Sequence, residues 1–409
     1  MAYLIIFFCA ISILFYSYKF NKTGSIILIL PLFYNFVVLY VILGSLFFTY
    51  GIDAPFDLYT LLSSDDLYKG SLPFMVSAFF FYIGGALVRN NRIKNRSDLF
   101  NLEIKYQKAL IFFILLVYFV YVLGYGAEQL IYRRGYIDEN YERNKTILVM
   151  FLVISPLVTS LIPFIKNKFS KYMVFSICYL IIFSTSSRFI VMLPFLYVIG
   201  TFLRFSKVKI RILLICMGLV FFGLIFVLQI RYYPFHGLIP NLDALFTKGL
   251  DLEYLSRGLN YAFSFSLFGV SYVLKNFTHD DMAFFISLNP LPSLFLNLDY
   301  MLQAQRMIGT SPMSAIATLS LAGYSWLISF YFLTGYCFSY IFIRMKGSTF
   351  LYYAVLGLFI IFTLFSIQYN LRGLSRFFYY SILIFIFHIA FKKINIIKRD
   401  GNEYTANRC

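Results

Sequence analysis

Apolar residues in this chain come in long blocks, and this feature leaves few folds open. Blocks such as 111–123 and 212–228 lie in apolar stretches of about fifteen to twenty-five residues, and a helix needs about 20 apolar residues to cross the hydrocarbon core of a bilayer. The blocks lack the period of two that marks the strands of a membrane barrel. Because lipid offers the backbone no hydrogen-bond partner, the blocks must be helices. The sequence therefore predicts an all-α fold, a polytopic transmembrane helical bundle.

The charge content excludes a soluble domain of this size. Only 13% of the 409 residues are charged, whereas 60% are hydrophobic; a soluble domain carries about 25% charged residues. Four cysteines lie inside predicted spans and none has the spacing of a zinc site or a disulfide framework. The first eighteen residues are apolar but have no basic segment before them, so we interpret them as a retained span and not as a signal peptide.

Hydropathy predicts about eleven spans, with ten to twelve allowed by their soft boundaries. They cover 2–18, 25–50, 73–88, 107–124, 147–165, 172–186, 189–203, 212–229, 322–343, 349–367 and 377–391. We therefore predict an N-terminal membrane bundle of about eight spans over 1–229, a large external loop over 230–321, three C-terminal membrane helices over 322–391, and a tail over 392–409.

The net charge of +17 is explained by membrane topology and not by a nucleic-acid partner. If the N-terminus lies outside, the segments inside carry 22 of the 35 basic residues and 4 of the 18 acidic ones, a balance of +18. The external segments carry the other 13 basic and 14 acidic residues, a balance of −1. The positive-inside rule selects this orientation. It predicts an external N-terminus, a cytoplasmic C-terminus and no nucleic-acid binding.

The loop over 230–321 contains short apolar runs, such as 259–274 and 282–288, which are dotted with Ser, Gly and Asn. They are too short and too polar for spans. We expect amphipathic helices that lie on the outer membrane surface or are partly re-entrant. A loop of this length without structure would be unusual unless it served a function.

Arginines on the external side need an explanation, because topology selects against them there. Arg188 lies in a tight turn between two spans, Arg231 directly follows a span, and Arg372 and Arg376 lie in the link before the last span. Planar guanidinium groups match phosphate oxygens bidentately, so such a group suits a lipid diphosphate at headgroup level. The alternative is that each arginine reaches lipid headgroups or pairs with a loop carboxylate. For Arg133, Arg134 and Arg143, the nearby acids favour pairing.

Acid–base candidates lie in the large loop, and the local cluster His279-Asp280-Asp281 is the most suggestive for activating a sugar hydroxyl. The simpler interpretation, which we favour, is that Thr278 or Asp280 caps the helix that follows. The remaining candidates are His236, Asp243, Asp251, Glu253 and Asp299. Tyr232 and Tyr233 could stack on sugar rings or anchor the loop at the interface. No motif for a metal, ATP or a dinucleotide has a convincing context, so we expect no cofactor.

Three sequence features together resemble the Wzy-type O-antigen (oligosaccharide repeat unit) polymerases. They are the Ser-Ser-Arg turn at 186–188, Arg231 just after the next span, and the stretch Leu-Asn-Pro-Leu-Pro-Ser at 288–293 followed by 309–322. Chain length, span count and the single large external loop agree with this family. Relatives often carry an acid in the small-residue run after the Asn-Pro motif, whereas 315–323 has none.

The resemblance implies an activity and a location. The family transfers a growing glycan from undecaprenyl diphosphate to a lipid-linked repeat at the periplasmic face of the bacterial inner membrane, as part of lipopolysaccharide biosynthesis. It implies a fold related to GT-C glycosyltransferases and O-antigen ligases, no metal, and partners such as a chain-length regulator and a flippase. The catalytic candidates are Arg188, Arg372, Asp281 and His279. The substrate-binding candidates are Arg231, Arg376, Arg134, Arg306, Tyr232 and Tyr233.

Three other activities stay open at this stage. An O-antigen ligase uses the same donor with a lipid A–core acceptor, and the sequence barely separates it from a polymerase. A lipid-linked oligosaccharide flippase or other transporter has similar hydropathy, but the long external loop and the absence of an internal repeat count against it. A membrane acyltransferase normally has His and Arg in its early spans, and the first three spans here have neither.

Overall fold

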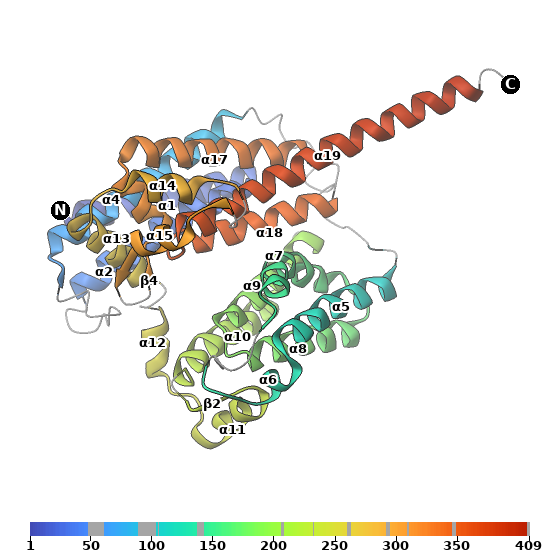
Figure 1. Cartoon of the computed structure of the whole chain (residues 1–409), viewed down its shortest axis with the longest axis horizontal. Coiled ribbons are helices and arrows are strands. Elements are labelled where there is room, and N and C mark those ends of the chain that lie inside the picture. The colour runs from blue at the N-terminus through green and yellow to red at the C-terminus, as the bar shows by residue number, and fades with distance from the viewer. Residues whose placement is uncertain are drawn as a thin grey trace. The chain divides into compact units, whose positions relative to one another are not determined.

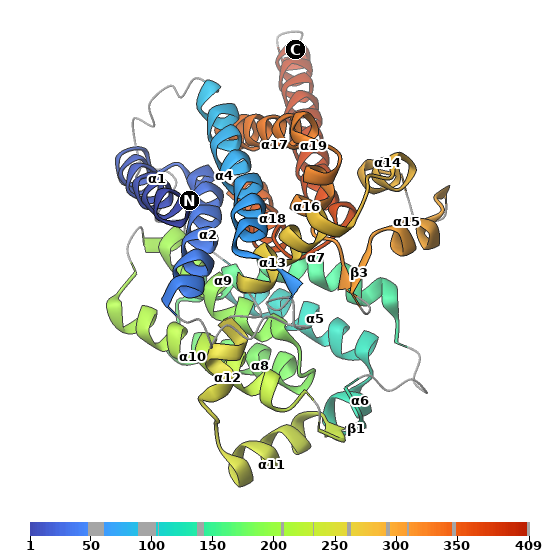
Figure 2. The same cartoon turned by 90° about the vertical axis from the view of Figure 1, so that its left-hand side faces the viewer.

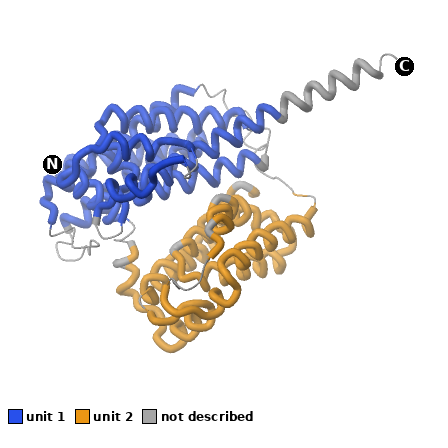
Figure 3. Tube along the Cα trace, in the orientation of Figure 1, with its two compact units in different colours: residues 1–91, 260–409 blue, residues 92–259 orange. Residues whose placement is uncertain are grey.

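The computed structural model describes residues 1–47, 61–88, 104, 106–136, 143–205, 208–231, 233–259, 263–291, 295–308, 311–345 and 349–406. These residues are almost entirely helical, as predicted, with two short antiparallel strand pairs (Figure 1). The chain divides into two compact units, residues 1–91 with 260–409 and residues 92–259 (Figure 3). These units cut across the predicted ranges 1–229 and 322–391, which describe membrane topology and stay a prediction.

Unit 1 is built from helices at both ends of the chain. Its elements are α1 (Ala2–Thr23), η1 (Ile26–Leu28), α2 (Ile29–Phe47), α4 (Ser64–Leu87), α13 (Phe265–Asn276), α14 (Asp281–Leu288), α15 (Leu298–Ala304), β3 (Arg306–Ile308), β4 (Ser311–Pro312), α16 (Ala315–Leu321), α17 (Tyr324–Arg344), α18 (Thr349–Phe365) and α19 (Leu371–Ala406). Helix α2 packs against α1 and α4, and α4 packs against α17; Figure 2 shows α1, α2 and α4 as neighbours. In Figure 1 the N-terminus lies at the end that holds α13 and β4, and α19 runs away from it.

Unit 2 contains the middle of the chain. Its elements are α5 (Gln107–Tyr125), α6 (Ala127–Ile131), β1 (Arg133–Arg134), α7 (Lys145–Leu161), η4 (Ile162–Phe164), α8 (Lys168–Ser184), η5 (Arg188–Val191), α9 (Met192–Phe205), α10 (Ile210–Gln229), β2 (Phe235–His236), α11 (Leu238–Lys248) and α12 (Glu253–Leu259). Strand β1 pairs with β2, which places Arg133 opposite His236 and Arg134 opposite Phe235.

Each of the eleven predicted spans falls on a helix, and seven helices in the described residues are long and apolar enough to cross a membrane. An eighth candidate is the pair Thr146–Leu152 and Ile154–Phe164, which is bent by 47°. The apolar helices Phe189–Phe202 and Leu351–Phe365 are shorter than a span. The chain is therefore a multi-pass helical membrane protein, and the count of eleven stays a prediction.

Small residues let the helices approach closely, as is common in membrane bundles. A methyl group on Gly84 of α4 would collide with the backbone carbonyl of Phe332 on α17, and one on Gly335 would collide with that of Phe81. Buried hydroxyls also join helices: the oxygens of Tyr34 and Tyr331 lie 2.8 Å apart. These contacts fix the α2, α4 and α17 core of unit 1.

Two helices of the predicted external loop lie inside unit 1 and not on its surface. Eight of the twelve residues of α13 are buried, and six of the seven residues of α16 are buried. Helix α13 packs against α4 and α16. An isolated amphipathic helix would leave one face exposed, whereas other helices of unit 1 cover α13 and α16; the placement of the loop at the outer membrane surface or partly inside the membrane stays a prediction.

The segments predicted on the outside lie together at one end of each unit. In unit 1, Lys275 Nζ contacts Asp66 Oδ2 at 2.9 Å, and the amide of Ala315 donates to the carbonyl of Tyr369 at 2.8 Å. In unit 2, the amide of Gly135 donates to the carbonyl of Pro234 at 2.7 Å. Segments predicted inside meet elsewhere in unit 2, where Gln107 accepts from the amide of Lys166 at 2.8 Å. These contacts join segments that the charge distribution predicts on the same side, and the topology itself stays a prediction.

Candidate functional site

Asp280 is the N-cap residue of helix α14, which confirms the cap interpretation. Its Oδ1 accepts a hydrogen bond from the amide of Ala283 at 2.8 Å, and its Oδ2 accepts from the hydroxyl of Tyr300 at 2.6 Å. Both bonds favour the ionised carboxylate, and they hold the pKa of Asp280 below its usual value. Asp280 is therefore a structural anion and a poor proton acceptor.

The adjacent pair, His279 and Asp281, has the geometry of an oriented base. His279 Nε2 lies 3.0 Å from Asp281 Oδ1, and the histidine ring meets the ring of Phe284 edge-on at 5.3 Å. The Asp281 side chain is 85% exposed and that of His279 is 26% exposed. A carboxylate bound to one ring nitrogen fixes the orientation of the imidazole and leaves the other nitrogen for proton exchange. The structure thus brings these two catalytic candidates together.

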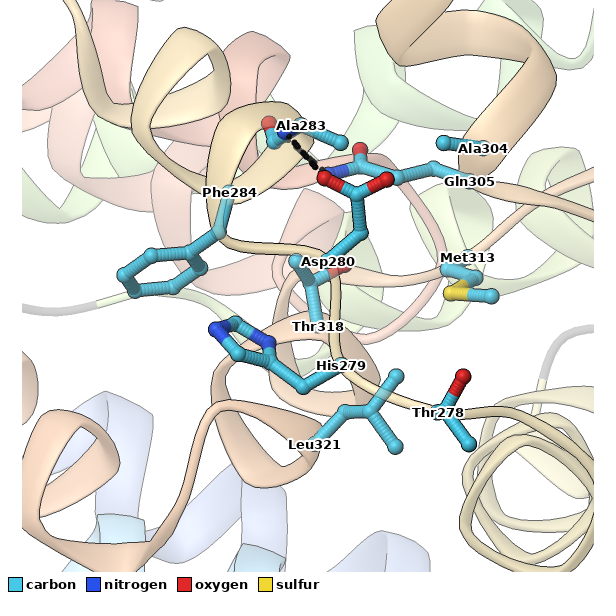
Figure 4. Close-up of a pocket in the computed structure, with 10 residues that line it drawn as sticks. All are labelled: Thr278, His279, Asp280, Ala283, Phe284, Ala304, Gln305, Met313, Thr318 and Leu321. Carbon is cyan, nitrogen blue, oxygen red and sulfur yellow. Dashed lines mark hydrogen bonds between the residues drawn. The ribbon is translucent and has the colours of Figure 1, made fainter.

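A cavity of about 20 Å³ lies beside this pair (Figure 4), which is room for about one water molecule. It is lined by Thr278, His279, Asp280, Ala283, Phe284, Ala304, Gln305, Met313, Thr318 and Leu321. Gln305 is buried and donates from Nε2 to Ser287 Oγ at 2.7 Å. Its Oε1 is buried and has no hydrogen-bond partner among the described residues. The cavity therefore contains acceptor groups that suit a hydroxyl ligand.

Arg372 is buried and binds the backbone. Its Nη1 donates to the carbonyls of Ile286 at 3.0 Å and Asn289 at 3.1 Å, and its Nη2 donates to that of Leu291 at 2.9 Å. The guanidinium thus satisfies carbonyls at the C-terminal end of α14, where a cation is favoured. This geometry makes Arg372 a positioning residue for the segment that follows α14, and direct contact with substrate stays a prediction.

The other two arginines predicted in this region lie on neighbouring elements. Arg306 is exposed on β3, where it pairs with Pro312, and it follows Gln305 of the cavity. Arg376 is half-buried on α19, one turn beyond Arg372. Helix α14 contacts both α15 and α19, and α16 contacts α19. The five candidates of unit 1 therefore lie on or next to α14 or a helix that contacts it: His279, Asp281, Arg306, Arg372 and Arg376.

Unit 2 holds a second polar cluster, centred on the buried side chain of Arg133. Its Nη1 donates to the carbonyl of Ser184 at 2.9 Å and its Nη2 to that of Thr185 at 2.8 Å. Further bonds run to the carbonyls of Gln129 and Tyr136. The side chain is 1% exposed. The carbonyls of Ser184 and Thr185 lie at the C-terminal end of α8, and a buried helix end needs donors. The nearby loop acids Asp138, Glu139 and Glu142 lie outside the described residues, so pairing of Arg133 with one of them stays a prediction.

His236 lies in the same cluster and is fully buried. Its Nδ1 lies 3.1 Å from Ser186 Oγ, which also accepts from Asn241 Nδ2 at 3.1 Å. Ser186 has a φ of 55°, a left-handed conformation that costs energy for a residue with a side chain. Burial and the charge of Arg133 lower the pKa of His236 to about 4, so the ring is neutral at pH 7. The loop base suggested by the sequence is therefore a structural histidine.

The remaining candidates all belong to unit 2. Arg188 is the first residue of η5, but its side chain lies outside the described part of the chain. Arg231 follows α10 and is half-buried, and Arg134 is exposed on β1. The ring of Tyr233 lies 4.2 Å from Lys248 Nζ. Tyr232 lies outside the described residues. The four described positions belong to links of unit 2 that the charge distribution predicts on the outside.

Sequence reasoning missed the environment of the pocket. It did not single out Gln305 or Trp326, although Trp326 is the only tryptophan in the chain. Within the described ranges, no group of three or more His, Cys, Asp and Glu side chains could hold a metal ion. No family model, curated protein or solved structure matches this chain.

Proposed function

We propose that this chain is a membrane glycosyltransferase, an O-antigen polymerase that transfers a growing glycan from undecaprenyl diphosphate to a lipid-linked oligosaccharide repeat. The observation that carries the proposal is the His279–Asp281 pair at 3.0 Å, which lies beside a small cavity lined in part by Thr278, Gln305 and Thr318. These residues belong to the loop that the charge distribution predicts on the periplasmic face of the inner membrane.

The reaction needs one proton acceptor and one anion stabiliser. The acceptor hydroxyl oxygen attacks the anomeric carbon of the donor, and the bond from that carbon to the phosphate oxygen breaks. His279, held by Asp281, takes the hydroxyl proton. The electron pair of the broken bond leaves with the lipid diphosphate. The products are an elongated lipid-linked glycan, undecaprenyl diphosphate and one proton.

Arginine supplies the second requirement. Charge grows on the diphosphate as the sugar leaves, and preorganised cations in a site shielded from water lower that barrier. Arg376 and Arg306 are the candidates in unit 1, because Arg376 lies on α19 and Arg306 follows α15, and both of these helices contact α14. Arg134, Arg188 and Arg231 form a second group on the external links of unit 2, where they suit a lipid diphosphate at headgroup level.

The test is chain growth in proteoliposomes that contain purified protein and synthetic undecaprenyl-diphosphate repeats. We expect a ladder of products and release of one undecaprenyl diphosphate per bond formed. Asp281→Asn should slow the reaction about 100-fold, because it removes the group that orients the base. The matched control is Asp299→Asn, because Asp299 is an exposed acid in the first turn of α15, as Asp281 is in α14.

Other outcomes assign other activities. Translocation of the repeat without chain growth identifies a flippase and rejects the proposal. Transfer to a lipid A–core acceptor without self-elongation identifies a ligase. A full ladder from Asp281→Asn at the wild-type rate rejects the assignment of the base.

A further inference from the structure

The one tryptophan of the chain lies at the polar end of unit 1. Trp326 is the third residue of α17 and is 42% exposed. Its ring meets those of Phe284 and Phe285 edge-on, with centroids 5.3 Å and 5.9 Å away. Two rings of α14 therefore hold an exposed indole in a defined orientation.

The same aromatic contacts connect Trp326 to the polar pair. Phe284 is 1% exposed and lies between the two, with its ring 5.3 Å from that of Trp326 and 5.3 Å from that of His279. Phe285, which is 54% exposed, lies on the Trp326 side. The contacts therefore run from the exposed Trp326 through the buried Phe284 to His279, which bonds the exposed carboxylate of Asp281.

This combination matches the chemistry of a sugar ring. A pyranose has faces of C–H groups, which pack on aromatic rings, and a rim of hydroxyls, which donate to carboxylates and accept from polar hydrogens. Sites for small polar ligands are lined in this way, with aromatic side chains for contact and a few polar groups for orientation. Asp281 supplies two acceptor oxygens, and it is 85% exposed.

We propose that Trp326 and Phe285 form a sugar-binding subsite, which packs against one ring of a neutral glycan and directs its hydroxyl rim towards His279 and Asp281. The inference deepens the proposed function and rests on it for the role of the bound sugar, which is the acceptor. Binding of the sugar does not depend on the proposed function, because binding needs no reaction.

Tryptophan near the end of a span can also anchor a helix in the lipid interface. The contacts of Trp326 distinguish it from its neighbour Tyr324, which is 45% exposed. The ring of Trp326 is held by α14, the helix that begins with Asp281. An anchor needs no such contact, so the arrangement favours a glycan over a lipid.

Because Trp326 is the only tryptophan, its fluorescence reports this surface alone. The experiment titrates wild-type protein in nanodiscs with a panel of methyl hexosides and methyl N-acetylhexosaminides. We expect a saturable change in emission for at least one sugar, and a clearly higher dissociation constant in Asp281→Asn. No response to any sugar in the panel overturns the proposal. Strong quenching by lipids with brominated acyl chains, together with no response to sugar, identifies a lipid anchor.

Kinetics provide the second measurement. Trp326→Leu should raise the KM for the acceptor about 10-fold with little change in kcat, because a lost aromatic contact is worth about 1 kcal/mol or somewhat more. Tyr324→Leu is the matched control and should leave KM unchanged. If the sugar binds but no glycan chain grows, the subsite stands and the proposed function fails. If chains grow and Trp326→Leu has the wild-type KM, the subsite fails.

Discussion

The polar ends of the two units each contain a buried arginine that binds carbonyls at a helix end, yet they differ in what surrounds it. In unit 2 the cluster is closed to solvent. Arg133, His236 and Asn241 are buried, and each bonds to a residue in 183–186, at the end of α8. In unit 1, Arg372 binds the segment after α14, while His279, Asp281 and Trp326, at or against the start of α14, are partly or largely exposed. The difference teaches that a buried arginine can support the backbone in both units, whereas only unit 1 leaves its polar candidates exposed, which is why the proposed chemistry is assigned there.

The largest expected effect is on the closed cluster. Arg133→Ala should destabilise unit 2 by about 3–5 kcal/mol, because each buried carbonyl left without a donor costs about 1–3 kcal/mol. Thermal unfolding in detergent measures the change. Arg134→Ala is the control, because that side chain is exposed on the same strand, and it should change stability by less than about 0.5 kcal/mol. Equal effects of the two substitutions would reject a structural role for Arg133.

Arg372→Lys should destabilise unit 1 by about 2 kcal/mol. A lysine ammonium is a single compact donor, so it cannot span three carbonyls as the guanidinium fork does. Arg344→Lys, an exposed position at the end of α17, is the control and should change stability by less than about 0.5 kcal/mol. If Arg372→Lys loses activity while its melting temperature stays at the wild-type value, Arg372 acts on the substrate directly. That result would contradict a supporting role like that of Arg133.

The third prediction concerns the pH dependence of unfolding, which reports the buried His236 of unit 2. The pKa of His236 is lowered to about 4 in the folded state and is about 6.5 in an unfolded chain. The unfolded chain therefore takes up the proton first as pH falls, and stability that is present above pH 6.5 is lost progressively towards pH 4. We expect a loss on the order of 1–3 kcal/mol. His236→Gln should remove this part of the pH dependence, and an unchanged profile would contradict the neutral buried ring.

The smallest effect concerns the cap of α14. Asp280→Ala should cost about 1 kcal/mol, and Asp280→Ser should cost less, because serine also accepts from the third helical amide. Melting temperatures of the two variants measure the difference. If they are equal, the bond from Tyr300, which serine does not restore, matters more than the cap.

Much of the fold follows from the sequence, because hydrocarbon length and backbone hydrogen bonding leave helices as the only choice for apolar blocks. All eleven predicted spans are helical in the structure, and Asp280 caps α14 as the local pattern predicts. Local patterns carry no information on contacts distant in sequence. Arg372 binds carbonyls more than eighty positions away, so its burial was not predictable.

The same limit applies to the site. The contact of His279 with Asp281 could be predicted from the sequence, because two residues in one short segment can meet whatever the packing of the rest of the chain. The contact of Trp326 with Phe284 could not, because it depends on the packing of α14 beside α17. The buried state of α13 and α16 was also missed, because small and polar residues such as Ser266 and Ser320 hide a buried helix from a hydropathy scan.

The most direct test of this account measures rate and stability on the same preparation of His279→Gln. We predict that chain growth from undecaprenyl-diphosphate repeats falls about 100-fold or more, the usual contribution of a general base, while the melting temperature stays at the wild-type value. Growth at the wild-type rate in this variant would contradict the claim that the exposed pair of unit 1 performs the chemistry.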